Sequence, residues 1–302
     1  MLSNRLVPAH RPTFGEARIP EMTLSAITPT DTRSFFRPVS TDLVTLLRGL
    51  PPADWQRPTV AGRWVVRDVV AHLVDVTLRR LSVHRDRWTP RRASQPAMAE
   101  RDFVAFINRL NAEWVTIASR FSPRVLTDLF EKASNDLAGW FEALPIDAPA
   151  LFAVSWAGEE ASEGWFDVGR EFTELWHHQE QIRMAVGASS LEDSRYLRAV
   201  IEIAVRGLPH AYRDVEPQPG RTVVIDVSGP SGGKWTLSRE PTRWTILSGA
   251  PPVATTRVRL ADGALWKLLF NVFSQHDAEK VIQIDGLPDL AVPLLKARSV
   301  IV

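Results

Sequence analysis

Cysteine is absent from this chain of 302 residues. No disulfide can form, no cysteine-based zinc site can be built, and no side-chain thiol can act as a nucleophile. If the protein carries out thiol chemistry, the thiol must therefore arrive on a small molecule. The sequence also lacks any run of about eighteen apolar residues, so we expect no segment that spans a membrane.

A surplus of charge of either sign is missing as well, since 36 basic and 35 acidic residues leave a net charge of +1. Nucleic-acid partners call for a basic face, so this balance of charges argues against a nucleic-acid partner.

The first thirty residues lack the apolar core of a secretory signal and are interrupted by four prolines, so we expect residues 1–30 to be a poorly ordered extension. These features are typical of a cytoplasmic protein, either a monomer or a homodimer.

Residues 31–215 carry apolar side chains at three- and four-residue steps, which is the period of amphipathic helices. A serine followed by a proline at positions 122 and 123 marks a helix start, and Gly187 marks a helix end. We predict an all-helical bundle of the four-helix type over this region, with helices at about 31–50, 66–88, 98–121, 122–144, 165–186 and 193–212.

After Gly220 the apolar pattern changes to alternation, which is typical of half-buried strands. We predict strands at 222–228, 234–238, 242–248, 255–260 and 281–284, with helices beginning at Asp262 and covering 288–297. Residues 221–302 should therefore form a small α+β domain with a mostly antiparallel sheet.

The most informative pair in the chain is Glu174 and His178, which lie four residues apart in a predicted helix. At this spacing a carboxylate and an imidazole share one helix face, one turn apart. A solvent-facing ion pair is the more common outcome of such spacing, and His177 lies three residues from Glu174, so spacing does not choose between the two histidines. The pair borders an apolar stripe, however, where side chains can point into a crevice of the bundle; the stripe consists of Trp165, Phe172, Leu175 and Ile182.

His72 on the second predicted helix is the candidate third ligand. A lone histidine on an apolar helix is more often hydrogen-bonded in a core, but apolar neighbours on both sides direct this one inward. Asp68 and Asp75 lie one turn away on either side, and we expect Asp75 to orient the imidazole ring. His84, close to several arginines, is expected to be a solvated helix end. Two imidazoles and one carboxylate suit zinc, nickel, iron or manganese, and three protein ligands leave positions open for catalysis.

Three segments of the sequence together resemble the mycothiol-dependent maleylpyruvate isomerase family, whose members belong to the DinB-like metal-binding bundles. The segments are Leu50-Pro-Pro-Ala-Asp-Trp-Gln-Arg-Pro-Thr59, Trp64-Val-Val-Arg-Asp-Val-Val-Ala-His-Leu73 and Arg170-Glu-Phe-Thr-Glu-Leu-Trp-His-His-Gln179. The C-terminal region resembles the sterol-carrier-protein-like domain that often follows this bundle. The resemblance implies that His72, Glu174 and His178 bind the metal, and thus selects His178 over His177. The three side chains should then meet at about 2.0–2.2 Å from one ion.

The resemblance also implies a function. It indicates a divalent-metal-dependent enzyme, with zinc favoured, that uses a low-molecular-weight thiol such as mycothiol as cosubstrate. The reaction would be isomerisation or S-transfer on a small electrophilic substrate, which makes the protein an isomerase or a transferase. Two alternatives share the same ligands: a non-catalytic protein that binds metal or an apolar ligand, and a metal-dependent hydrolase. The stretch from Trp266 to Ser274 contains no arginine, and Asn271-Val272 stand where the family leads us to expect Gly-Arg, so the substrate and the catalytic residues stay open.

Overall fold

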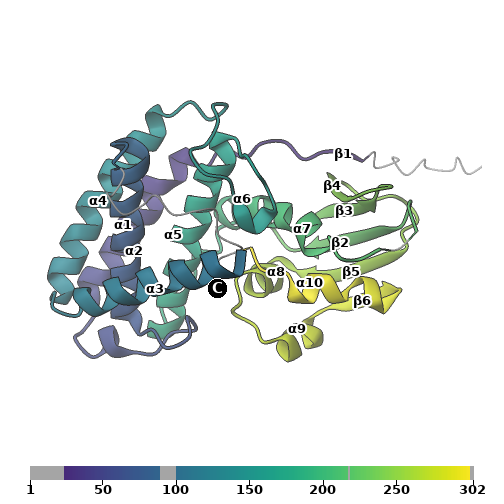
Figure 1. Cartoon of the computed structure of the whole chain (residues 1–302). Coiled ribbons are helices and arrows are strands. Elements are labelled where there is room, and N and C mark those ends of the chain that lie inside the picture. The colour runs from purple at the N-terminus through teal and green to yellow at the C-terminus, as the bar shows by residue number, and fades with distance from the viewer. Residues whose placement is uncertain (1–23, 89–99, 217, 300–302) are drawn as a thin grey trace, which may run out of the picture.

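The structure is a computed structural model that describes residues 24–88, 100–216 and 218–299. Its N-terminal lobe is a bundle of helices, and its C-terminal lobe is a sheet with helices packed on it (Figure 1). This arrangement confirms the fold class predicted from the sequence. None of the helices in the described ranges has a stretch long and apolar enough to cross a membrane.

The helices of the bundle agree closely with the periodic segments. Their bounds are α1 (Phe36–Gly49), α2 (Val66–Arg80), α3 (Glu100–Ala118), α4 (Pro123–Ala143), α5 (Gly164–Val186), α6 (Ser194–Ala204) and α7 (Leu208–Ala211). The second predicted helix was too long, because the α-helix ends at Arg80 and one π-helical turn continues to Arg85. The last predicted helix of the bundle is divided into α6 and α7 by a 3-10 turn.

Local chemistry explains where two of these helices begin and end. The side chain of Ser122 accepts a hydrogen bond from the backbone N–H of Val125, and Pro123 occupies the first position of α4. At the other end of α5, Gly187 has φ 70°, a left-handed conformation that costs glycine little. The N–H of Ala188 then bonds back to the carbonyl of Arg183 at 2.9 Å and closes the helix.

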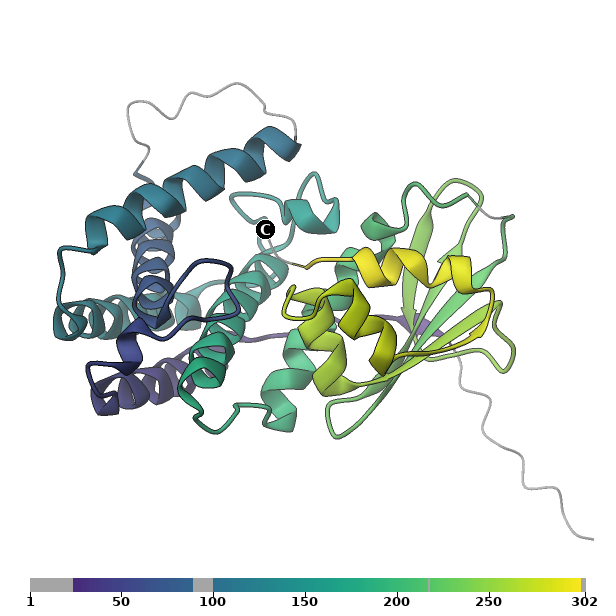
Figure 2. The same cartoon turned by 90° about the horizontal axis from the view of Figure 1, so that it is seen from below.

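Helices α1, α2, α4 and α5 enclose the apolar interior of the bundle, and α3 packs along α2 (Figure 2). Each enclosing helix contributes fully buried side chains, among them Leu43, Val70, Phe130 and Phe172. Burying a side chain of this size stabilises the fold by about 1.5–3 kcal/mol. This packing fixes the relative positions of α2 and α5.

The second lobe contains a sheet with the strand order β1-β4-β3-β2-β5-β6. The bounds are β1 (Ser25–Ala26), β2 (Thr222–Ser228), β3 (Gly233–Arg239), β4 (Trp244–Ser248), β5 (Thr256–Ala261) and β6 (Gln283–Gly286). The β2–β5 pair is parallel and the other pairs are antiparallel, so the sheet is mostly antiparallel, as the sequence predicted. Most of the predicted N-terminal extension lies outside the described residues, but Ser25 pairs with Ser248, so the expected extension contributes an edge strand.

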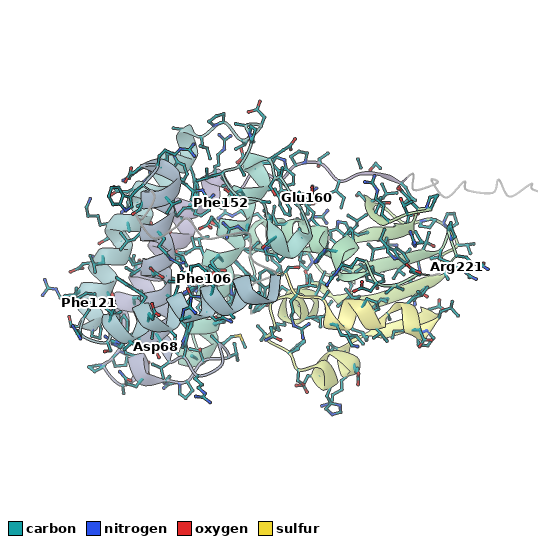
Figure 3. The ribbon with its side chains drawn as sticks, viewed as in Figure 1. Asp68, Phe106, Phe121, Phe152, Glu160 and Arg221 are labelled. Carbon is teal, nitrogen blue, oxygen red and sulfur yellow. The ribbon has the colours of Figure 1, made fainter. Side chains whose placement is uncertain are left out.

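Helices α8 (Asp262–Leu269), α9 (Gln275–Val281) and α10 (Val292–Lys296) complete the second lobe, and α9 was not predicted. The lobes meet where α6 packs against α8. Here the rings of Trp176 and Trp266 meet edge to face with centroids 5.1 Å apart, and both side chains are buried. Figure 3 shows this two-lobed arrangement with side chains, with Asp68 and Phe106 in the bundle and Arg221 in the sheet lobe. The apolar core is continuous from one lobe to the other.

Candidate metal centre

Helices α2 and α5 bring His72, Glu174 and His178 together. The Nε2 atom of His72 lies 2.9 Å from Oε1 of Glu174, and the Nε2 atom of His178 lies 3.2 Å from the same oxygen. One ligand atom from each residue lies within 4.8 Å of the other two, a separation that allows all three to bind one divalent ion. Among the residues that the structure describes, no other group of histidines and carboxylates has such a geometry.

The protonation states of two of these groups suit metal binding. Burial lowers the pKa of His72, which favours the neutral imidazole that a metal requires. Burial alone would raise the pKa of Glu174, but the electrostatic interaction with His178 and the hydrogen bond from His72 outweigh it and hold that pKa well below its usual value. Glu174 is therefore an ionised carboxylate at neutral pH.

The outer nitrogens of the two histidines have different surroundings. Nδ1 of His178 lies 2.7 Å from Oε1 of Gln181, within the same helix. Nδ1 of His72 is buried and has no hydrogen-bond partner. The prediction that Asp75 orients His72 is therefore wrong: Asp75 pairs with Arg79 at 3.0 Å, one helical turn further on. Likewise, Asp68 accepts a hydrogen bond from the backbone at the start of α2 instead of contacting the imidazole.

His177, the neighbour that spacing alone did not exclude, faces a different environment. Its Nδ1 lies 2.8 Å from the carbonyl oxygen of Thr173, one turn back on its own helix. Its ring packs on that of Phe270 in the second lobe, with centroids 5.0 Å apart. Burial lowers the pKa of His177 to about 3, so the imidazole is neutral. The side chain thus serves the contact between the lobes.

Glu171, one turn before Glu174 on α5, belongs to a buried network of ion pairs. Arg80 donates to both oxygens of Asp167, at 3.0 Å for the first of them, and both side chains are almost fully buried. Arg170 lies 3.1 Å from Asp167 and 2.6 Å from Glu171. Because Glu171 is held by arginine, it is not a free alternative ligand for an ion at Glu174.

The same network includes His84, which the sequence placed at a solvated helix end. That prediction is wrong, since the His84 side chain is only 11% exposed and its ring meets that of Phe152 edge to face. Nε2 of His84 lies 3.3 Å from Arg80. Burial lowers the pKa of His84 to about 3. His84 lies in the π-helical turn that follows α2, four residues after the buried Arg80.

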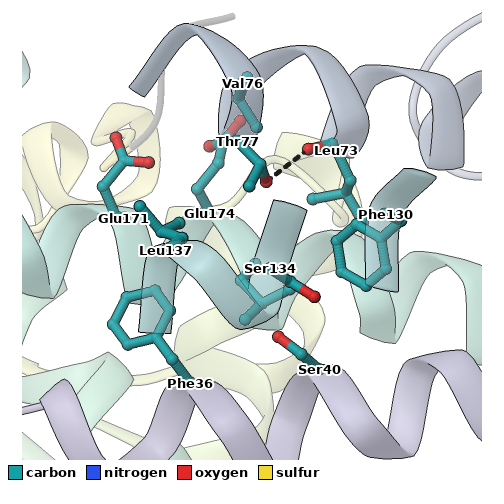
Figure 4. A pocket seen from close by; sticks show the side chains of 11 residues that line it. Phe36, Ser40, Leu73, Val76, Thr77, Phe130, Ser134, Leu137, Glu171 and Glu174 are labelled. Carbon is teal, nitrogen blue, oxygen red and sulfur yellow. Dashed lines mark hydrogen bonds between the residues drawn. The ribbon is translucent and has the colours of Figure 1, made fainter. Parts of the chain in front are cut away.

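A small pocket in the bundle lies beside Glu174 (Figure 4). Its walls come from α1, α2, α4 and α5 and are mainly apolar, with Phe36 and Phe130 among them. Five of the eleven residues that line it are polar, and the hydroxyl of one of them, Ser40, is buried without a hydrogen-bond partner. The carboxylate ligand therefore borders a partly apolar space, where the field of a charge is less screened than in water.

Asn271, the position at which the resemblance led us to expect glycine, follows α8 in the second lobe. Asn271 has φ 58°, the left-handed conformation that glycine adopts most readily. Its side-chain oxygen accepts a hydrogen bond of 2.9 Å from Nε of Arg298, so a guanidinium group does reach this turn, from a part of the chain that the sequence did not single out. The turn directly follows Phe270, which packs on His177.

Residues 36–183 match the family model for the mycothiol maleylpyruvate isomerase N-terminal domain. The bundle belongs to this family. The resemblance drawn from the three sequence segments is thereby confirmed. A search of curated proteins gives no match.

Two solved structures are similar to most of the chain. One is the crystal structure of a histidine-to-alanine mutant of mycothiol-dependent maleylpyruvate isomerase, with a TM-score of 0.51 and 13% identity over 84% of this chain and 91% of that chain. The other is a crystal structure of mycothiol-dependent maleylpyruvate isomerase, with a TM-score of 0.49 and 14% identity over 78% of this chain and 86% of that chain. At 13% identity, the first of these likenesses shows a common fold.

Proposed function

We propose that this protein is a divalent-metal-dependent enzyme that uses a low-molecular-weight thiol, mycothiol or a similar compound, to transform a small electrophilic substrate. The observation that carries the proposal is the convergence of His72, Glu174 and His178 from two helices in a bundle of the mycothiol maleylpyruvate isomerase family. The absence of cysteine is consistent with it, because the nucleophilic sulfur then has to come from outside the chain.

The donor set fits a zinc-like ion. Two imidazole nitrogens and one carboxylate oxygen are borderline ligands, and three protein ligands leave coordination positions for a small molecule. A divalent ion at this site would lower the pKa of a bound thiol, so that the thiolate forms at neutral pH. The mainly apolar walls of the pocket beside Glu174 limit the access of water to that carboxylate. The lobe that follows the bundle would shape the entrance and select the substrate.

Isomerisation is the reaction class that the names of the two similar structures favour, whereas the turn at Asn271 leaves the substrate open. A thiol that adds to an electrophilic double bond allows rotation about the resulting single bond, and its loss regenerates the alkene in the other geometry. S-transfer begins with the same attack and ends with departure of a leaving group. Both reactions need the same three ligands.

The test uses the purified full-length protein, stripped of metal and then reloaded with zinc. Thiol consumption and product geometry are followed with mycothiol and a panel of electrophiles that includes maleylpyruvate. We expect turnover that depends on both zinc and thiol, and that disappears in His178→Ala. Turnover by the stripped protein would overturn the proposal. Product release with zinc but without thiol would instead identify a hydrolase.

A further inference from the structure

We infer that Gln181 is the positioning residue that prepares His178 to bind metal through Nε2. The inference rests on the proposed function, because it concerns the same ligand set. Gln181 is only 5% exposed and follows His178 by three residues, so the two side chains are neighbours on one face of α5. Its amide oxygen lies 2.7 Å from Nδ1 of His178.

The proton of a neutral imidazole can sit on either nitrogen, and only the nitrogen without it can bind a metal. Nε2 of His178 faces the Glu174 carboxylate at 3.2 Å, whereas Nδ1 faces the Gln181 amide oxygen at the shorter distance of 2.7 Å. The Glu174 oxygen that faces Nε2 of His178 already accepts a hydrogen bond of 2.9 Å from Nε2 of His72, whereas the amide oxygen of Gln181 can only accept and faces Nδ1, so Gln181 holds the proton of His178 on Nδ1. Nε2 then presents its lone pair to the space between the three ligands.

His72 provides the internal comparison. Its Nε2 lies 2.9 Å from the same Glu174 oxygen, and its Nδ1 is buried without a partner. When Nε2 of His72 binds metal, the ring proton must occupy that unpartnered position, which is unfavourable for a buried donor. His178 avoids this cost because of Gln181. The two imidazoles are thus unequal ligands, and His178 is the better prepared of the two.

The decisive variants are Gln181→Leu, which removes the acceptor with little change of volume, and Gln181→Glu, which retains it. Zinc is titrated into the stripped full-length protein against a chromophoric chelator. We expect Gln181→Leu to bind zinc about 10–100-fold more weakly, as for other outer partners of metal-bound histidines, and Gln181→Glu to bind at least as tightly as the wild type. The matched control is Glu180→Gln, since Glu180 is equally buried on α5 but accepts from Ser190 and Leu191. Unchanged affinity in Gln181→Leu, or equal losses in both Gln181 variants, would overturn the inference.

A second measurement does not require metal or activity. Imidazole 15N spectra of the stripped protein, recorded at mildly alkaline pH, report which nitrogen of His178 carries the proton. We expect the proton on Nδ1 in the wild type and a shift toward Nε2 in Gln181→Leu, where Glu174 is the remaining acceptor. A wild-type proton on Nε2 would contradict the inference even if zinc binds. Conversely, a wild-type protein with the proton on Nδ1 but without zinc affinity would contradict the proposed function alone.

Discussion

Replacing each of two adjacent histidines on α5 by alanine should separate metal binding from folding stability. His178→Ala removes one of the three predicted ligands, and Glu171, a carboxylate one turn before Glu174 on the same helix, is held by Arg170 at 2.6 Å. Loss of an outer partner of a metal ligand already weakens binding by about 10–100-fold. Loss of the ligand itself should therefore weaken zinc binding by more than about 100-fold, or about 2.7 kcal/mol.

His177→Ala should have the opposite profile. Its imidazole is 2% exposed, bonds to the carbonyl of Thr173 and packs on Phe270, so its loss removes a buried hydrogen bond and a contact between the lobes. We expect the metal-free protein to lose about 1–3 kcal/mol of unfolding free energy. Zinc affinity should stay close to that of the wild type, because His177 contributes no atom to the predicted ligand group of His72, Glu174 and His178.

The assay has two arms. Competition with a chromophoric chelator gives the zinc affinity of each variant, and urea unfolding of the stripped proteins gives their stability. Equal loss of zinc affinity in both variants would show that the assigned register of α5 is wrong. Full affinity in His178→Ala would refute the ligand set itself.

Further predictions concern stability. Burial holds the pKa of His177 and His84 near 3, so both stay neutral in the native protein while the unfolded chain takes up protons below the ordinary histidine pKa of 6.5. The unfolded state then binds more protons, and the stability of the metal-free protein should fall from about pH 6.5 downward by about 1.4 kcal/mol per pH unit for each histidine; urea unfolding at several pH values would show a flat profile if this is wrong. Asp167→Asn removes the carboxylate that Arg80 contacts most closely in a buried network and should cost about 3–5 kcal/mol, whereas Arg37→Met at an exposed ion pair should leave stability almost unchanged; similar losses in both would contradict the importance of burial. Trp266→Ala should cost about 3–5 kcal/mol in thermal or urea unfolding, because the indole is 1% exposed between the lobes.

Local patterns in the sequence predicted most of the fold. The three- and four-residue steps predicted the helices of the bundle, and the change to alternation after Gly220 predicted the sheet. The relative orientation of Glu174 and His178 could be predicted because residues four apart on a helix share one face, whatever surrounds the helix. Their meeting with His72 is a long-range contact across 102 positions, and the sequence indicated it through the family resemblance.

The errors arose where two partners compete or where the partner is distant in sequence. Asp75 follows His72 by three residues and precedes Arg79 by four, and the charged partner prevails. Gln181 was overlooked because a glutamine near the end of a helix usually faces solvent, and its burial depends on tertiary packing. The pair of Arg80 and Asp167 spans 87 positions, and no local pattern indicates it.

Helix α5 links the candidate metal centre to the second lobe. Residues two apart on a helix point in nearly opposite directions, so Trp176 faces away from His178 and packs on Trp266 of the other lobe. His177 lies between these directions, with its ring centroid 4.0 Å from that of His178 and 5.0 Å from that of Phe270. The ring of His177 therefore lies between the imidazole of His178 and the second lobe, in two tilted ring contacts. Helix α5 thus carries two of the three candidate ligands on one side and a buried contact with the second lobe on the other, so the placement of the ligands and the packing of the two lobes depend on the same helix.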